Sequence, residues 1–185
     1  LPVRIKYNPI IIDHNQTIPD KIIIAPNHRK TPDSLVLASI IKNTVHWAAL
    51  KRFFTGEDSI FNNKKNVILR IITKFIFNNA GMIPIDRNDS NIESLNAMKE
   101  YLSDNAAIGI FPEGTTNKNP DQYRLGDVKA GAFDIAKISE TDILPVGVVW
   151  KNNRVAVCFG QIINIGNYGN VDDIKKAWIN NTTNA

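Results

Sequence analysis

Residues 22–33 read IIIAPNHRKTPD, and this segment organises the chain on both sides of it. Its first four residues are β-branched or small and carry no charge, which is typical of a buried strand, and the strand should stop at Pro26. Thr31 followed by Pro32 predicts the start of a helix, with the threonine as N-cap and the proline at the first helical position. The segment therefore predicts a strand, then a loop that carries His28, then a helix.

Strand and helix signals alternate along the rest of the chain. The first helix should reach about Lys42, on apolar residues at Leu35, Leu37, Ala38 and Ile41. Strands are expected at 44–50, 81–85, 106–111, 143–150 and 154–159, the last two as a hairpin around Asn152 and Asn153, and helices at 63–79, 90–103, 128–138 and 171–179. Residues 1–185 should therefore form one domain of the α/β class, a mixed sheet flanked by helices, without repeats or an internal linker.

Composition narrows the class of protein. A chain of 185 residues with 43% hydrophobic residues can bury one well-packed core. The net charge of +4 suits anionic lipid, an anionic substrate or nucleic acid equally well. A single cysteine, Cys158, excludes an intrachain disulfide and a thiolate metal cluster and favours a reducing, cytoplasmic setting. The three histidines lack metal-ligand spacing, so no metal is expected, and no apolar run reaches the roughly 18 residues that cross a bilayer.

His28 and Asp33 are the first candidate catalytic residues. They lie five positions apart, one on the loop and the other in the first turn of the expected helix, so the carboxylate can fold back onto one imidazole nitrogen. The other nitrogen could then accept a proton from an attacking hydroxyl, as the histidine does in hydrolytic triads. A capping aspartate beside a hydrogen-bonded loop histidine would show the same spacing, so the pair alone leaves both interpretations open.

Residues 111–115, FPEGT, stand where a buried strand breaks into a loop. Gly114 would let the backbone approach a ligand, while Glu113 and Thr115 offer an acceptor and a hydroxyl for polyol oxygens. An ordinary turn has the same composition.

Residues 81–87, GMIPIDR, form a strand that delivers Arg87 at its end. The arginine offers a planar fork for a phosphate, although a surface arginine paired with Asp86 or Asp89 would look the same. In the helix expected at 63–79, Arg70 and Lys74 lie at the edge of a wide apolar sector. Such a helix could lie on anionic lipid or pack into the core with a solvated basic edge.

These segments together resemble the motifs of a known family. His-x4-Asp at 28–33, GMIPIDR at 81–87, FPEGT at 111–115 and Leu-Pro-Val at 144–146, in this order, are similar to the four motifs of the glycerolipid acyltransferases. That family includes the 1-acylglycerol-3-phosphate acyltransferases. The resemblance covers about residues 22–163, and Lys51 and Lys129 match as well.

The resemblance implies a reaction and a role for each motif residue. The family moves a fatty acyl group from an acyl thioester, acyl-CoA or acyl carrier protein, to the hydroxyl of 1-acylglycerol-3-phosphate or a related lyso-phospholipid precursor, with no other cofactor and no acyl-enzyme. Its members usually act at the cytoplasmic face of a membrane, so a peripheral protein on the inner face is expected. The implied roles are His28 as catalytic base, Asp33 as its orienting carboxylate, Arg87 and Lys129 as phosphate contacts, and Glu113, Gly114 and Thr115 around the glycerol.

Two departures bear on the acceptor. Thr116 stands where the family commonly has arginine, so part of the phosphate charge is missing unless Arg124 supplies it. Arg29 and Lys30 beside the histidine are more basic than is usual there. The same chemistry on a different lyso-lipid acceptor therefore stays open, as does a non-catalytic membrane-surface module. A nucleic-acid partner is not expected, because the basic residues do not interleave with aromatic ones.

Overall fold

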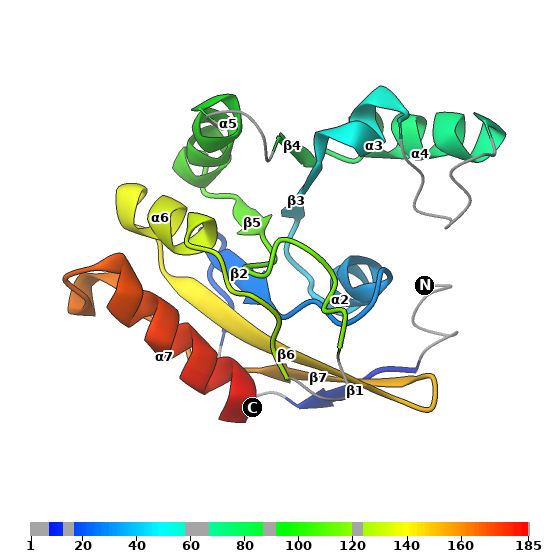
Figure 1. Cartoon of the computed structure of the whole chain (residues 1–185). Coiled ribbons are helices and arrows are strands. Elements are labelled where there is room, and N and C mark those ends of the chain that lie inside the picture. Colours follow the sequence, from blue (N-terminus) through cyan, green and yellow to red (C-terminus); the bar gives the residue numbers. More distant parts are fainter. Residues whose placement is uncertain (1–7, 13–16, 58–66, 87–91, 120–123, 185) are drawn as a thin grey trace.

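The strand expected at the start of the 22–33 segment lies inside a seven-stranded sheet, as β2 (Ile23–Pro26) (Figure 1). The structure is a computed structural model that describes residues 8–12, 17–57, 67–86, 92–119 and 124–184. β2 pairs in parallel with β6 (Ile143–Lys151) on one side and with β5 (Ala107–Gly109) on the other. All four of its residues are buried, which explains its uninterrupted apolar sequence.

The sheet is mixed, as predicted. Its strand order is β1-β7-β6-β2-β5-β3-β4, and the five strands from β6 to β4 are mutually parallel. β7 runs antiparallel to β6, and the three-residue edge strand β1, which the sequence pattern did not predict, runs parallel to β7. The bounds of the remaining strands are β1 Ile10–Ile12, β3 Val45–Leu50, β4 Ile83–Ile85 and β7 Arg154–Phe159.

Helices cover both faces of the sheet in a single domain (Figure 1). Alternate residues of β2 point to opposite faces: Ile23 packs in the cluster under α5, α6 and α7, and Ile24 in the cluster under α2. A short helix, α3, precedes α4 beyond β3. The bounds are α2 Asp33–Ile40, α3 Lys51–Thr55, α4 Val67–Asn79, α5 Ile92–Ser103, α6 Gly131–Ile138, the 3-10 turn Ile165–Asn167 and α7 Val171–Asn184.

The hairpin between β6 and β7 is confirmed. Asn152 and Asn153 form its turn with φ angles of 49° and 61°, and asparagine tolerates this left-handed conformation better than most residues. The predicted start of α2 is wrong. The helix begins at Asp33 with Pro32 as its N-cap residue, and no side chain caps it, so Thr31 is not the cap.

The predicted buried face of α2 is also partly wrong. Leu35 is 47% exposed, whereas Val36 and Leu37 are buried. A helix with apolar residues all round its circumference does not reveal from sequence which side meets the sheet.

A close approach between β5 and β3 shapes the sheet next to the site. A Cβ atom placed on Gly109 would lie 2.3 Å from Cε3 of Trp47. The Trp47 ring in turn stacks on Phe111, with 5.5 Å between the ring centroids. Glycine at 109 therefore lets the indole lie flat on β5.

We predict that Gly109→Ala lowers the free energy of unfolding by about 1–3 kcal/mol, because overpacking displaces Trp47. The measurement is urea denaturation followed by circular dichroism. Gly131→Ala is the matched control, since nothing lies within 4 Å of a Cβ built there, and it should leave stability unchanged or raise it. A Gly109→Ala protein as stable as the Gly131→Ala protein would contradict the steric argument.

Candidate active site

The candidate residues converge where the parallel strands end. The carboxyl ends of β2, β5 and β6 lie at one edge of the sheet, the edge where ligands bind in open α/β sheets. His28 follows β2, Phe111 and the FPEGT loop follow β5, and Trp150 lies near the end of β6. Three segments that are far apart in sequence therefore meet in one place.

The contact expected between His28 and Asp33 is present. Nδ1 of His28 lies 3.0 Å from Oδ2 of Asp33. The Asp33 side chain is fully buried, while the His28 side chain is 17% exposed. The carboxylate thus lies behind the imidazole, and the ring separates it from solvent.

Asp33 is held by further hydrogen bonds. Its Oδ2 accepts bonds from the backbone N–H groups of Arg29 at 2.6 Å and Lys30 at 2.8 Å. Its Oδ1 accepts a bond from Nε1 of Trp150 at 2.7 Å. Because Oδ2 acts as an acceptor toward both backbone groups, Nδ1 of His28 is the ring nitrogen that donates to it, and in the neutral imidazole Nε2 then carries the lone pair.

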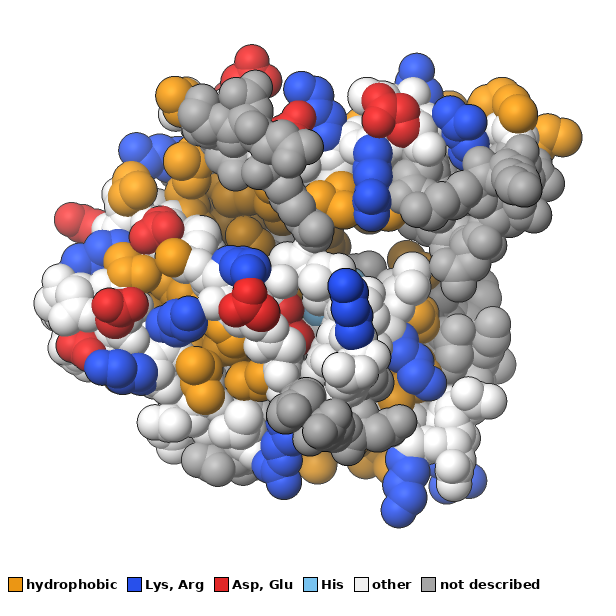
Figure 2. All heavy atoms as spheres, in the orientation of Figure 1, with side chains coloured by type: hydrophobic (Ala, Val, Ile, Leu, Met, Phe, Trp, Pro, Cys, Tyr) orange, Lys and Arg blue, Asp and Glu red, His pale blue; other side chains and the backbone are white. Residues whose placement is uncertain are grey.

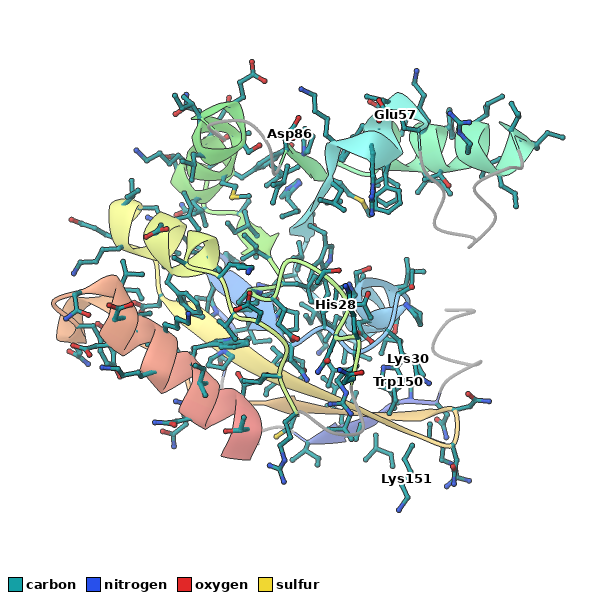
Figure 3. All side chains as sticks on the ribbon, in the orientation of Figure 1. His28, Lys30, Glu57, Asp86, Trp150 and Lys151 are labelled. Carbon is teal, nitrogen blue, oxygen red and sulfur yellow. The ribbon has the colours of Figure 1, made fainter. Side chains whose placement is uncertain are left out.

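The lone pair of Nε2 faces the loop after β5. Oγ1 of Thr116 lies 3.4 Å from Nε2, and Phe111 stacks on the imidazole with 4.1 Å between ring centroids. Figure 2 shows histidine surface recessed among its neighbours near the centre of the face that it presents, and Figure 3 places His28 there. Nε2 therefore lies beside a hydroxyl, in a side chain that is partly exposed.

Glu113 is buried and supports the loops. Its side chain is 2% exposed. Oε1 accepts a hydrogen bond from the backbone N–H of His28 at 2.7 Å, and Oε2 accepts one from Gly126. The backbone N–H of Asn117 also donates to the carbonyl of His28 at 2.8 Å. The loops after β2 and β5 are thereby fastened to each other.

Asn27 is a site residue that sequence reasoning missed. Its side-chain amide pairs with the backbone of Val148 in β6: Oδ1 accepts at 2.6 Å, and Nδ2 donates at 3.2 Å. The amide extends the sheet by one more pair of hydrogen bonds and places the following residue, His28. Its only sequence signal was a polar residue directly after a buried strand.

Three other predicted substrate contacts lie at the surface, in contrast to the buried Glu113. Gly114, with a φ of 63°, and Thr115 are exposed on the FPEGT loop. Lys129 is exposed, its ammonium pairs with Asp127, and its backbone N–H donates to Pro112 at 2.8 Å.

The predicted phosphate contact Arg87 lies outside the described residues. The guanidinium of Arg124, the alternative source of charge, donates to the carbonyl of Thr183. Within the described ranges, no group of three or more His, Cys, Asp and Glu side chains could hold a metal ion.

Comparisons with known proteins agree with the motifs. A family model described as Acyltransferase matches residues 10–149. A chloroplastic 1-acyl-sn-glycerol-3-phosphate acyltransferase of Arabidopsis thaliana is 28% identical over 114 residues, covering 60% of this chain and 31% of that protein. A 1-acyl-sn-glycerol-3-phosphate acyltransferase of Helicobacter pylori is 29% identical over 129 residues, covering 69% and 48%. The chain thus spans about a third to a half of these curated relatives.

A solved structure shares the fold. The crystal structure of the 1-acyl-sn-glycerophosphate acyltransferase PlsC from Thermotoga maritima superposes with a TM-score of 0.68 over 95% of this chain and 70% of that chain, at 14% sequence identity. The mixed sheet and its flanking helices are therefore a known arrangement.

The burial of Glu113 leads to a pH-dependent contribution to stability. Burial raises the pKa of its carboxyl above the ordinary 4.5, against the opposing effect of the His28 and Gly126 N–H groups and of nearby positive charge. Such a group stabilises the fold most when protonated, and this contribution is lost as pH rises through the raised pKa. The free energy of unfolding of the wild type minus that of Glu113→Gln should therefore fall as pH rises from 4.5.

Urea titrations of both proteins at a series of pH values measure this difference. A difference that stays constant or grows with pH would show that burial does not control the ionisation of Glu113.

Proposed function

This chain belongs to the acyltransferase family, and on that basis we propose that it transfers a fatty acyl group to the free hydroxyl of 1-acylglycerol-3-phosphate or a related lyso-phospholipid precursor. The proposed donor is an acyl thioester, acyl-CoA or acyl carrier protein, and no other cofactor takes part. The proposed acceptor is the one that appears in the names of the relatives from Arabidopsis thaliana and Helicobacter pylori.

The geometry of the His28–Asp33 pair is the observation that carries the proposal. Nδ1 is bound to a buried carboxylate, so Nε2 is the nitrogen available as a base. The hydroxyl of Thr116 beside Nε2 indicates where an acceptor hydroxyl would lie, because either hydroxyl can donate a hydrogen bond to the lone pair of Nε2. A capping aspartate alone would not account for an imidazole whose second nitrogen faces a hydroxyl on the loop after β5.

In the proposed mechanism the acceptor attacks directly. Nε2 of His28 removes the proton from the acceptor hydroxyl as its oxygen attacks the thioester carbonyl carbon. The resulting oxyanion collapses, the carbon–sulfur bond breaks, and the departing thiolate takes the proton from His28. Asp33 keeps the imidazole oriented and stabilises its positive charge while the proton resides there. No protein nucleophile forms an acyl-enzyme, and Cys158 takes no part.

The phosphate and glycerol contacts remain proposals. Gly114 and Thr115 are exposed on the loop that brings Thr116 to the base, which supports their placement beside the glycerol. Arg87 and Lys129 are the proposed phosphate contacts. Glu113 acts by holding the loops, since both of its oxygens already accept backbone hydrogen bonds. A different lyso-lipid acceptor is the second candidate, favoured by threonine in place of the family's arginine at 116.

We predict that His28→Gln lowers the turnover of acyl transfer about 10²- to 10⁴-fold, because glutamine cannot accept the proton. The assay incubates purified protein with labelled acyl-CoA or acyl carrier protein and either glycerol 3-phosphate or its 1-acyl derivative. His46→Gln is the matched control: His46 bonds the carbonyl of Gly81 and stacks on Tyr101, and its loss should leave turnover close to normal.

Two outcomes would contradict the proposal. If His28→Gln turned over normally, the base mechanism would be wrong. If the wild type transferred no acyl group to any lyso-lipid while it still bound vesicles, the chain would be a membrane-surface module.

We further propose that α4 docks on a membrane surface. Of its apolar side chains, Phe77 packs on Phe53 and Phe54 of α3 and Leu69 is partly buried, whereas six others are exposed. Figure 2 shows hydrophobic surface at the end of the molecule where α4 lies. Among the described helices, none has the length and apolarity to cross a bilayer. The proposed location is the cytoplasm, where the protein would lie on the inner face of the membrane. The exposed apolar residues of α4 are Val67, Ile68, Ile71, Ile72, Phe75 and Ile76.

Charge around α4 favours an anionic surface. Lys74 on α4 and Lys51 and Arg52 on the contacting helix α3 are exposed. Arg70 is partly buried and donates to the carbonyl of Gly56, so it holds α4 to the end of α3. A basic rim around exposed apolar side chains is typical of helices that bind in the plane of anionic lipid.

We predict that Phe75→Asp and Lys74→Glu each weaken co-sedimentation with phosphatidylglycerol vesicles, the second by about 1 kcal/mol per charge removed. Phosphatidylcholine vesicles should bind the wild type less. Ile138→Asp, at an exposed apolar residue at the end of α6, is the matched control and should bind as the wild type does. Equal binding by all three variants would show that α4 is not the docking surface.

A further inference from the structure

The chain has three tryptophans, and their indole N–H groups lie in different surroundings. Nε1 of Trp47 is buried without a hydrogen-bond partner among the described residues. Nε1 of Trp178 donates to the backbone carbonyl of Ala25 at 2.8 Å. Nε1 of Trp150 donates to the carboxylate of Asp33 at 2.7 Å. We propose that Trp150, which lies outside the family motifs, is a positioning residue for the His28–Asp33 pair.

Trp150 holds the part of the carboxylate that the local loop does not. The hydrogen bonds to Oδ2 come from His28, Arg29 and Lys30, in the loop just before Asp33. The bond to Oδ1 comes from the end of β6, 117 residues away in sequence. The two sets of bonds engage different oxygens, so together they fix the rotation of the carboxylate about its Cβ–Cγ bond.

The position of the indole is itself well defined. Trp150 lies near the end of β6, and its backbone pairs with Val155 of β7 in the ladder that leads to the hairpin turn. The ammonium of Lys30 lies over its ring, 4.9 Å from the centroid, and covers it on the side of the loop (Figure 3). A donor carried by a paired strand and covered by a cation has little freedom to leave Asp33.

The consequence for catalysis concerns the imidazole, and it rests on the proposed function. Proton transfer from the acceptor hydroxyl requires Nε2 to point at it, and Nε2 points there only while Nδ1 stays on Oδ2. Without the bond to Oδ1, the carboxylate can rotate and the imidazole can follow it. Trp150 therefore acts through Asp33 on the orientation of the base, and does not touch the substrate.

The test compares three single substitutions. Trp150→Phe keeps an aromatic ring but removes the N–H, and should lower kcat about tenfold, the effect expected from one hydrogen bond to a charged group, with KM for both substrates nearly unchanged. Trp150→His keeps a ring N–H at the matching position and should recover most of kcat in an assay at alkaline pH. Trp178→Phe, the matched control, loses the same kind of donor in the core and should lower stability without lowering kcat.

Proton NMR of the Nδ1–H of His28 adds a readout that needs no substrate. Trp150→Phe should shift or broaden this resonance, and Trp178→Phe should leave it in place. Failure of the proposed function would appear as a wild type without transfer activity, and the NMR comparison would still decide the role of Trp150. The inference is overturned if Trp150→Phe keeps the wild-type resonance and kcat, or if Trp150→His is as slow as Trp150→Phe.

Discussion

A fully buried carboxylate, that of Asp33, imposes the main constraint on this structure. Burying an ionised carboxylate is very unfavourable unless hydrogen bonds replace its water. Backbone N–H groups of the preceding loop, the imidazole of His28 and the indole of Trp150 all donate to it. The loop must curl around Asp33 to do so, and this explains why α2 begins at Asp33 itself and not after a threonine cap. The curled loop also presents His28.

Glu113 repeats this arrangement at the end of the neighbouring strand. Its buried carboxylate accepts backbone hydrogen bonds from the loops that carry His28 and Gly126. Two buried carboxylates at the ends of β2 and β5 thus fasten the loops to each other and to the sheet. Groups held in this way keep their geometry without reorganising during a reaction, which is what a base and its partner need. The sequence places Asp33 and Glu113 in motifs. It does not show that Asp33 holds the imidazole whereas Glu113 holds two loops together.

Two segments away from these carboxylates are exposed to solvent. Gly114 and Thr115 are exposed on the outer part of the FPEGT loop, and α4 exposes most of its apolar side chains. Rigid groups therefore surround the imidazole, while the parts proposed to meet glycerol, phosphate and lipid remain accessible. Thr116 stands between the two regions, since it lies on the open loop and its hydroxyl faces Nε2 of His28.

The sequence by itself determined the α/β class, the order of most strands and helices, the hairpin at Asn152 and Asn153, and the contact between His28 and Asp33. These depend on residues close together along the chain, where periodicity, turn preference and spacing act directly. Tertiary structure alone decided which side of α2 is buried, that α4 faces outward, and that Asn27 and Trp150 support the site. Each of these depends on which elements pack together, and a partner such as Trp150, 117 residues from Asp33, leaves no local pattern for sequence reasoning to detect.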